Sequence, residues 1–160
     1  MIAGIWRVVA AGMLSTLSMD VLTGIAAALR VVAPLPPNLV GRWFASVARA
    51  QPFHADIARA SPVPHELVAA FPVHYVIGTA LTTAFVYGTG ALGWSRGVGV
   101  ALAFGLSTSL LPWLVMFPSM GYGLFGTHGP EGTRLFTSSL MTHAFFGLGL
   151  WIAVRVMKCS

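Results

Sequence analysis

Charged residues are scarce in this sequence. Only 8% of its 160 residues are Asp, Glu, Lys or Arg, and 56% are hydrophobic, whereas soluble proteins carry about a quarter of charged residues. A chain with so little charge cannot cover a water-soluble fold with polar surface. Four long segments contain none or one of these charged residues, and each can cross about 30 Å of hydrocarbon: Val8–Leu29 (interrupted by Asp20), Leu67–Ser95, Gly97–Pro130 and Leu135–Val154. We therefore predict an all-α integral membrane protein, a four-helix bundle.

The four segments predict a single transmembrane domain over residues 1–160, with spans near 5–33, 66–93, 97–117 and 134–157. The first span resembles a secretory signal because Arg7 precedes it and it contains Ala26–Ala28. Its apolar run is longer than the roughly 7–15 residues of a cleaved signal, and an acid lies at its centre. We therefore interpret it as a permanent span. The expected partners are the lipid bilayer and either a second copy of the chain or another membrane subunit.

Cysteine is nearly absent, since Cys159 is the only one, and this excludes a disulfide framework and a site of paired thiols. Lys and Arg outnumber Asp and Glu by nine to four, but they lie singly near segment ends. That distribution favours contact with lipid headgroups over contact with nucleic acid. The basic residues divide almost evenly between the two faces, so the positive-inside rule selects no orientation: Arg7, Arg96, Arg155 and Lys158 against Arg30, Arg42, Arg49, Arg59 and Arg134.

The long connection, residues 34–65, is predicted to contain a short helix of its own. Prolines in Pro34–Asn38 end the first span, and Pro62 with Glu66 marks the start of the second, where an acid is favourable beside the helix dipole. In residues 39–49 two helical faces separate by polarity: Val40, Trp43, Phe44 and Val47 on one, Arg42, Ser46 and Arg49 on the other. This pattern predicts a short interfacial amphipathic helix that lies at the membrane surface, with Trp43 at headgroup depth.

Five motifs, spread over nearly the whole chain, carry a family resemblance: LVGRW (39–43), HADIA (54–58), HYVIG (74–78), MFPSMGYG (116–123) and HAFFGLGL (143–150). In this order they resemble the bacterial membrane proteins grouped as domain of unknown function 2938. The resemblance implies a small four-span protein of the bacterial inner (cytoplasmic) membrane, and it implies no particular activity. The segment Phe125–Pro130 departs from the more polar loop of that family pattern and contains His128.

Asp20 is the unusual residue of the first span. At about 1.5 Å of rise per residue, it lies about 18 Å from the loop-side end of its span, with His74 about 12 Å and His143 about 13 Å from the same face. An acid and two imidazoles therefore share one layer of the bilayer on three different helices. A charge that faces lipid costs several kcal/mol, so we expect Asp20 to point inward, toward His74 or His143.

Carboxylate and imidazole groups indicate two uses for this centre. They are ligands for divalent ions such as zinc, nickel or copper, and an Asp–His pair can also relay protons. We predict Asp20, His74 and His143 as the candidate metal or proton centre. Candidate entrance residues lie nearer the loop side: His54, Asp56, Met116, Met120 and His128. Thioethers of Met116 and Met120, with Met19 and Met141 deeper in the membrane, would suit copper(I), and packing is the alternative role of these methionines.

A purely structural interpretation of the same residues is equally open at this point. A buried Asp–His hydrogen bond contributes about 0.6–2 kcal/mol to helix association in membranes, and the protein would then be a structural or accessory subunit without a ligand. Catalysis is disfavoured, because no group that would stabilise a leaving group accompanies the pair. A carrier acting alone is also disfavoured, since the sequence shows no internal repeat.

Overall fold

The structure is a computed structural model that describes residues 2–159, and all its regular elements are helices. They are, in chain order, α1 (Ile2–Ala28), α2 (Pro37–Ala48), η1 (Ile57–Arg59), α3 (Glu66–Ala91), α4 (Val98–Ser107), η2 (Pro112–Met116), α5 (Phe117–Ser119), η3 (Leu124–Gly126) and α6 (Thr133–Val156). Four helices are long and apolar enough to cross a membrane: Gly4–Ala28, Glu66–Ala91, Val98–Ser119 and Thr133–Val156. The predicted all-α fold with four spanning helices and a short helix in the first connection is confirmed.

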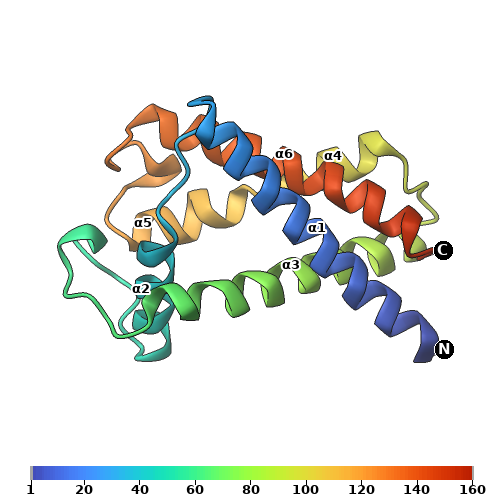
Figure 1. Cartoon of the computed structure of the whole chain (residues 1–160), viewed down its shortest axis with the longest axis horizontal. Helices are drawn as coiled ribbons and strands as arrows, with labels where there is room; N and C mark the ends of the chain where they lie inside the picture. The colour runs from blue at the N-terminus through green and yellow to red at the C-terminus, as the bar shows by residue number, and fades with distance from the viewer. Residues whose placement is uncertain (1, 160) are drawn as a thin grey trace.

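The four spanning helices pack in a definite order. α1 packs against both α3 and α6, α6 also packs against α4, and α2 packs against α3. Both chain ends and the connection from α3 to α4 lie at one end of the molecule, and α2 with the other connections lies at the opposite end (Figure 1). We call these two ends the terminal face and the loop face.

The first span is shorter than predicted. We expected it to continue to residue 33, but α1 ends at Ala28, and Arg30 adopts a left-handed φ of 60° two residues later. The Arg30 amide donates to the carbonyl of Ala27 at 2.9 Å, which closes the helix before Pro34 is reached. The bounds of the other three spans lie within two residues of the prediction.

The third span contains an irregular turn. Pro112 and Pro118 both lack an amide hydrogen and so cannot donate to the helical ladder. Between them η2 is a π-helix, in which the amide of Phe117 donates to the carbonyl of Pro112, five residues back. The span nevertheless continues from Val98 to Ser119.

Glycines allow the helix backbones to approach one another closely. A Cβ atom on Gly78 would lie 1.9 Å from the Thr16 hydroxyl oxygen, and one on Gly12 would lie 2.6 Å from the Cα of Thr79. These two contacts join α1 to α3. Small residues at helix contacts are typical of membrane bundles, where close packing replaces the hydrophobic effect as the driving force for association.

Two clusters of buried apolar side chains divide the bundle along its length. The terminal core draws on all four spanning helices and consists of Val8, Ala11, Phe85, Val86, Ala101, Phe146, Leu150, Ala153, Val154 and Cys159. The loop-side core joins α2, η1 and the end of the third span to α6, and consists of Leu39, Ile57, Trp113, Phe117, Met120, Tyr122 and Leu135. The terminal core includes Val8 and Ala11 of α1, and Asp20 lies further along this helix, toward the loop face.

The polar face of α2 packs against the rest of the protein. Arg42 is only 5% exposed and packs inward, while Val47 on the apolar face is 42% exposed. The guanidinium of Arg42 donates to both carboxylate oxygens of Glu66 at 2.9 Å. It also donates to the carbonyls of Ile57 and Ala60 at 3.1 and 2.8 Å. The hydrogen-bonded carboxylate raises the pKa of Arg42 above its usual value, so the cation is stable inside the protein.

Replacing Gly105 tests the contact between α4 and α6. A Cβ on Gly105 would lie 2.6 Å from the Cα of Gly147 and 2.7 Å from the carbonyl oxygen of His143. Gly105→Ala should therefore separate the helices and lower the free energy of unfolding by about 1–3 kcal/mol, measured by thermal unfolding in detergent. Gly99→Ala, in the same helix with open space around its Cβ, should be neutral or slightly stabilising. Equal melting temperatures for the two variants would contradict the contact.

Breaking the Arg42–Glu66 ion pair should destabilise the protein strongly. The two side chains are only 6% and 14% exposed, so Arg42→Leu leaves an uncompensated buried carboxylate and should cost about 3–5 kcal/mol. The double variant Arg42→Leu/Glu66→Leu should recover much of that loss. Arg49→Leu is the matched control, because Arg49 is exposed at the end of the same helix. If the double variant is less stable than Arg42→Leu, the pair is not the anchor of α2.

Candidate functional site

Asp20 and His74 form a hydrogen-bonded pair between α1 and α3. The Nε2 atom of His74 lies 3.1 Å from Oδ1 of Asp20, and each side chain is 33% exposed. The contact between Thr16 and Gly78 positions the pair, because Asp20 and His74 each lie one helical turn from it on the same stripe of their helices. The prediction that Asp20 has a histidine partner is confirmed.

The pair leaves one ring nitrogen of His74 free. An ionised carboxylate can only accept hydrogen bonds, so Nε2 carries the hydrogen and Nδ1 keeps its lone pair. Among residues 2–159 no hydrogen bond reaches Nδ1, and the ring of Tyr75 contacts the imidazole edge-on with centroids 5.9 Å apart. Asp20 therefore orients a nitrogen that can accept a proton or bind a metal ion.

His143 belongs to a second, separate pair. Its Nδ1 lies 2.7 Å from the hydroxyl of Thr108, where α6 contacts the third span. That hydroxyl donates to the carbonyl of Gly105 at 2.6 Å, so it accepts from His143. Because Gly149 packs against Ser18, the helical rise places His143 about 6 Å nearer the loop face than Asp20.

The three residues predicted as one centre are therefore arranged as two pairs at similar depth. In the described part of the chain, no three His, Cys, Asp or Glu side chains form a group that could hold a metal ion. Asp20 is bonded to Nε2 of His74, and His143 is bonded to Thr108, so the three side chains do not converge on one point. A metal ion held by all three side chains stays a prediction.

The two connections on the loop face are joined through their backbones. The amides of His54 and Ile57 donate to the carbonyls of Ser119 and Met120 at 2.7 and 3.0 Å. Gly121 makes this contact close: its φ is 87°, and a Cβ there would lie 2.1 Å from the carbonyl oxygen of Ala55. The segment from His54 to Ile57 therefore lies directly on the chain that follows the third span.

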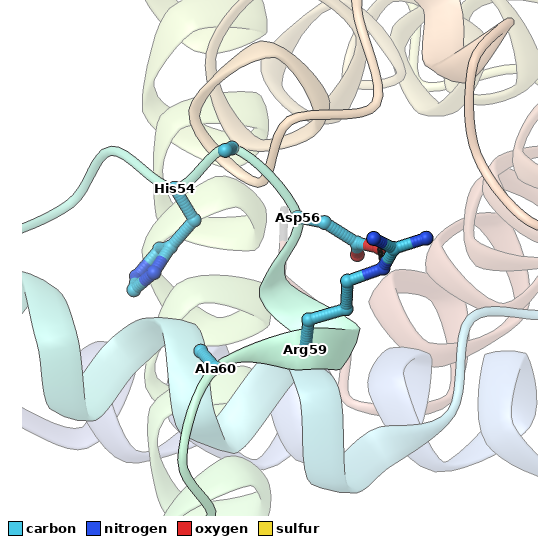
Figure 2. A pocket seen from close by; sticks show the side chains of 5 residues that line it. His54, Asp56, Arg59 and Ala60 are labelled. Atoms are coloured by element: carbon cyan, nitrogen blue, oxygen red, sulfur yellow. Dashed lines mark ion pairs between the residues drawn. The ribbon is translucent and has the colours of Figure 1, made fainter.

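Two shallow depressions flank Asp56 at this junction. One, of about 490 Å³, is lined by His54, Ala55, Asp56, Arg59 and Ala60, and the other, of about 220 Å³, includes Tyr122 and His128. Figure 2 shows Asp56 turned toward Arg59, with which it forms an ion pair at 3.3 Å, while the ring of His54 points away from both. The second Asp56 oxygen accepts from the Ala58 amide at 2.9 Å. The carboxylate is thus already bonded locally, and His54 and Asp56 do not converge on one point.

The methionines predicted near an entrance lie in different surroundings from those expected. Met120 is 0% exposed within the loop-side core, and Met116 packs against the same core. These positions favour the packing role over a thioether site open to copper. His128 is exposed, and its ring lies over Gly123, where a Cβ would come within 2.8 Å of Nδ1.

Comparison with known families gives a match over residues 9–157, to the family described as "Protein of unknown function (DUF2938)". The chain belongs to this family. The match includes both polar pairs and both connections on the loop face. Curated proteins and solved structures give no match. Family membership thus agrees with the resemblance of the motifs and leaves the chemistry to be argued from the site.

Adding a side chain at Gly121 should separate the two connections on the loop face. Gly121→Ala places a Cβ on the Ala55 carbonyl and strains a left-handed backbone. The amides of His54 and Ile57 should then exchange hydrogen for deuterium about tenfold faster than in the wild type, since each loses a carbonyl acceptor. The Ala58 amide is the internal control, because its bond to Asp56 is local. Unchanged exchange at His54 and Ile57 would contradict the contact.

Proposed function

We propose that this protein is a multi-pass protein of the bacterial inner membrane that binds a proton at the Asp20–His74 pair, with a small cation as the alternative occupant. The membrane assignment is supported by the four spanning helices and by the motif resemblance, which implies the bacterial inner membrane. The observation that carries the chemistry is the 3.1 Å contact of a carboxylate with an imidazole inside two apolar spans, each side chain one-third exposed. Intramembrane ionisable pairs of this kind mark ion and proton sites.

Ligand number favours a proton over a metal ion. A proton needs one lone pair, which Nδ1 of His74 provides once Asp20 holds Nε2. Zinc and similar ions take at least three protein ligands, and the described residues offer no such group. The site formed within a single chain is therefore better suited to a proton than to a divalent ion.

Charge balance in the span favours the same occupant. With a neutral imidazole the pair carries the net charge of the Asp20 carboxylate, which is costly in a low-dielectric layer. Uptake of one proton by His74 converts the pair into a neutral ion pair. The neighbouring titratable groups do not supply this compensation: Tyr75 and His143 carry no fixed positive charge, and Arg42 of α2 is held by Glu66.

Titration of the histidine side chains tests the proposal. Imidazole nitrogen signals are followed by NMR from about pH 4 to about pH 9 in detergent, with His74→Ala identifying the His74 signal. Asp20→Asn keeps the shape and removes the charge that favours the imidazolium. The pH course of the His74 signal in Asp20→Asn should therefore differ from that of the wild type. His128, which is exposed on the loop face, should titrate identically in both proteins.

Two other results would replace the proposal that the pair binds a proton. No titration of His74 in the wild type, together with lower melting temperatures of Asp20→Asn and His74→Ala, would make the pair a structural clamp between α1 and α3. Stoichiometric zinc or copper in the purified wild type, absent from both variants, would make the occupant a metal ion. Metal content is therefore measured on the same three preparations.

A further inference from the structure

The half of the bundle between the Asp20–His74 pair and the terminal face is closed by apolar packing. The terminal core draws side chains from α1, α3, α4 and α6. Phe85 of α3 contacts Phe104 of α4 with ring centroids 5.3 Å apart, so these two helices also meet across the core. Phe85 is 2% exposed and Leu150 is 0% exposed. Such a filled apolar core does not hold a chain of water molecules.

The crossing of α1 and α3 closes the shortest route from the pair to that face. Thr16 is 1% and Thr82 is 0% exposed, and the glycine contacts with Thr16 and Thr79 place the backbones too close for a water molecule to pass between them. The Thr16 hydroxyl also donates to its own helix, to the carbonyl of Gly12 at 2.9 Å. Its hydrogen is thus directed to its own helix and not to Asp20, which lies one turn away.

On the loop side of the pair the surroundings are different. α1 and α3 diverge toward the loop face (Figure 1), because α1 stays on α6 while α3 is covered by α2. On α1 the Thr23 hydroxyl, one turn from Asp20, is buried and makes no hydrogen bond within residues 2–159, as is the case for the Thr82 hydroxyl two turns from His74 on the terminal side. An unused hydroxyl group therefore lies next to the pair on the side toward the loop face.

From these contrasts we infer that the Asp20–His74 centre exchanges protons with the compartment at the loop face only, and this inference rests on the proposed function. The centre responds to the pH of that one compartment. In the arrangement described here it binds a proton without passing it across the membrane, and conduction would require the α1–α3 crossing to open. The other titratable groups around the pair are Tyr75 and His143, and toward the loop face the Arg42–Glu66 pair of α2 and α3.

Cysteine accessibility from each side of the membrane tests the inference. Single cysteines are introduced into a Cys159→Ser background and exposed to a cationic, membrane-impermeant methanethiosulfonate in sealed vesicles of both orientations. Ser61→Cys and Ser95→Cys identify the loop and terminal faces, because both serines are exposed in connections at opposite ends. Asp20→Cys probes the centre itself, and Thr23→Cys is a nearly isosteric second probe that preserves the Asp20–His74 pair. Thr82→Cys probes the closed half.

The expected result is labelling of Asp20→Cys and Thr23→Cys only from the side that labels Ser61→Cys, with no labelling of Thr82→Cys from either side. Labelling of any of the three from the Ser95→Cys side would overturn the inference. So would complete protection of both Asp20→Cys and Thr23→Cys, which would show that water does not reach the centre. The histidine titration decides the proposed function independently. If His74 titrates but the cysteines are labelled from both sides, only the inference of one-sided access is refuted. If His74 does not titrate but the cysteines are labelled only from the loop side, only the proposal of proton binding is refuted.

Discussion

The close contact between α1 and α3 is the constraint on which the polar centre depends. Two glycines, Gly12 and Gly78, bring the backbones together, and helical periodicity then places Asp20 and His74 one turn beyond on facing stripes. Neither side chain would find the other if the helices were held apart by ordinary side chains. Packing on the terminal side and chemistry on the loop side are thus consequences of the same crossing.

Most hydroxyl groups inside the bundle are bonded to their own helix. Ser15, Thr16 and Thr89 each donate to a carbonyl one turn earlier, at 2.6–2.9 Å. In a medium without water this is the simplest way to satisfy a hydroxyl group. It also makes the exceptions informative: Asp20 with His74 and Thr108 with His143 reach across helices, and the buried hydroxyls of Thr23, Thr82 and Ser109 have no partner among the described residues. The chemistry of the protein is concentrated in these few groups.

Much of the architecture could be predicted from the sequence because a bilayer imposes a simple rule. Long segments with almost no charged residues were predicted to span the bilayer. Asp20 lies deep within its span, so a histidine at similar depth was predicted as its partner. Depth alone did not give direction around each helix, so His143 was placed in the same centre although it faces Thr108. Thr108 could not be recognised, since the third span contains no charged residue that marks a polar face.

The amphipathic helix shows the limit of such reasoning most clearly. A helical wheel of residues 39–49 correctly separates Arg42 and Ser46 from Val40 and Val47, but it does not say which face meets water. In the structure Arg42 faces Glu66 and Val47 faces outward. The difference arises because Glu66 lies next to Arg42 only in three dimensions, although the two are 24 positions apart in sequence.

The order of residues along the chain gives this ion pair a role in biogenesis. Arg42 leaves the ribosome before Glu66, so α2 emerges with a cation that has no partner yet. Burying it at that moment would cost several kcal/mol, and α2 must therefore wait among water and headgroups until α3 has entered the bilayer. Stable docking of α2 therefore depends on the Glu66 carboxylate of α3.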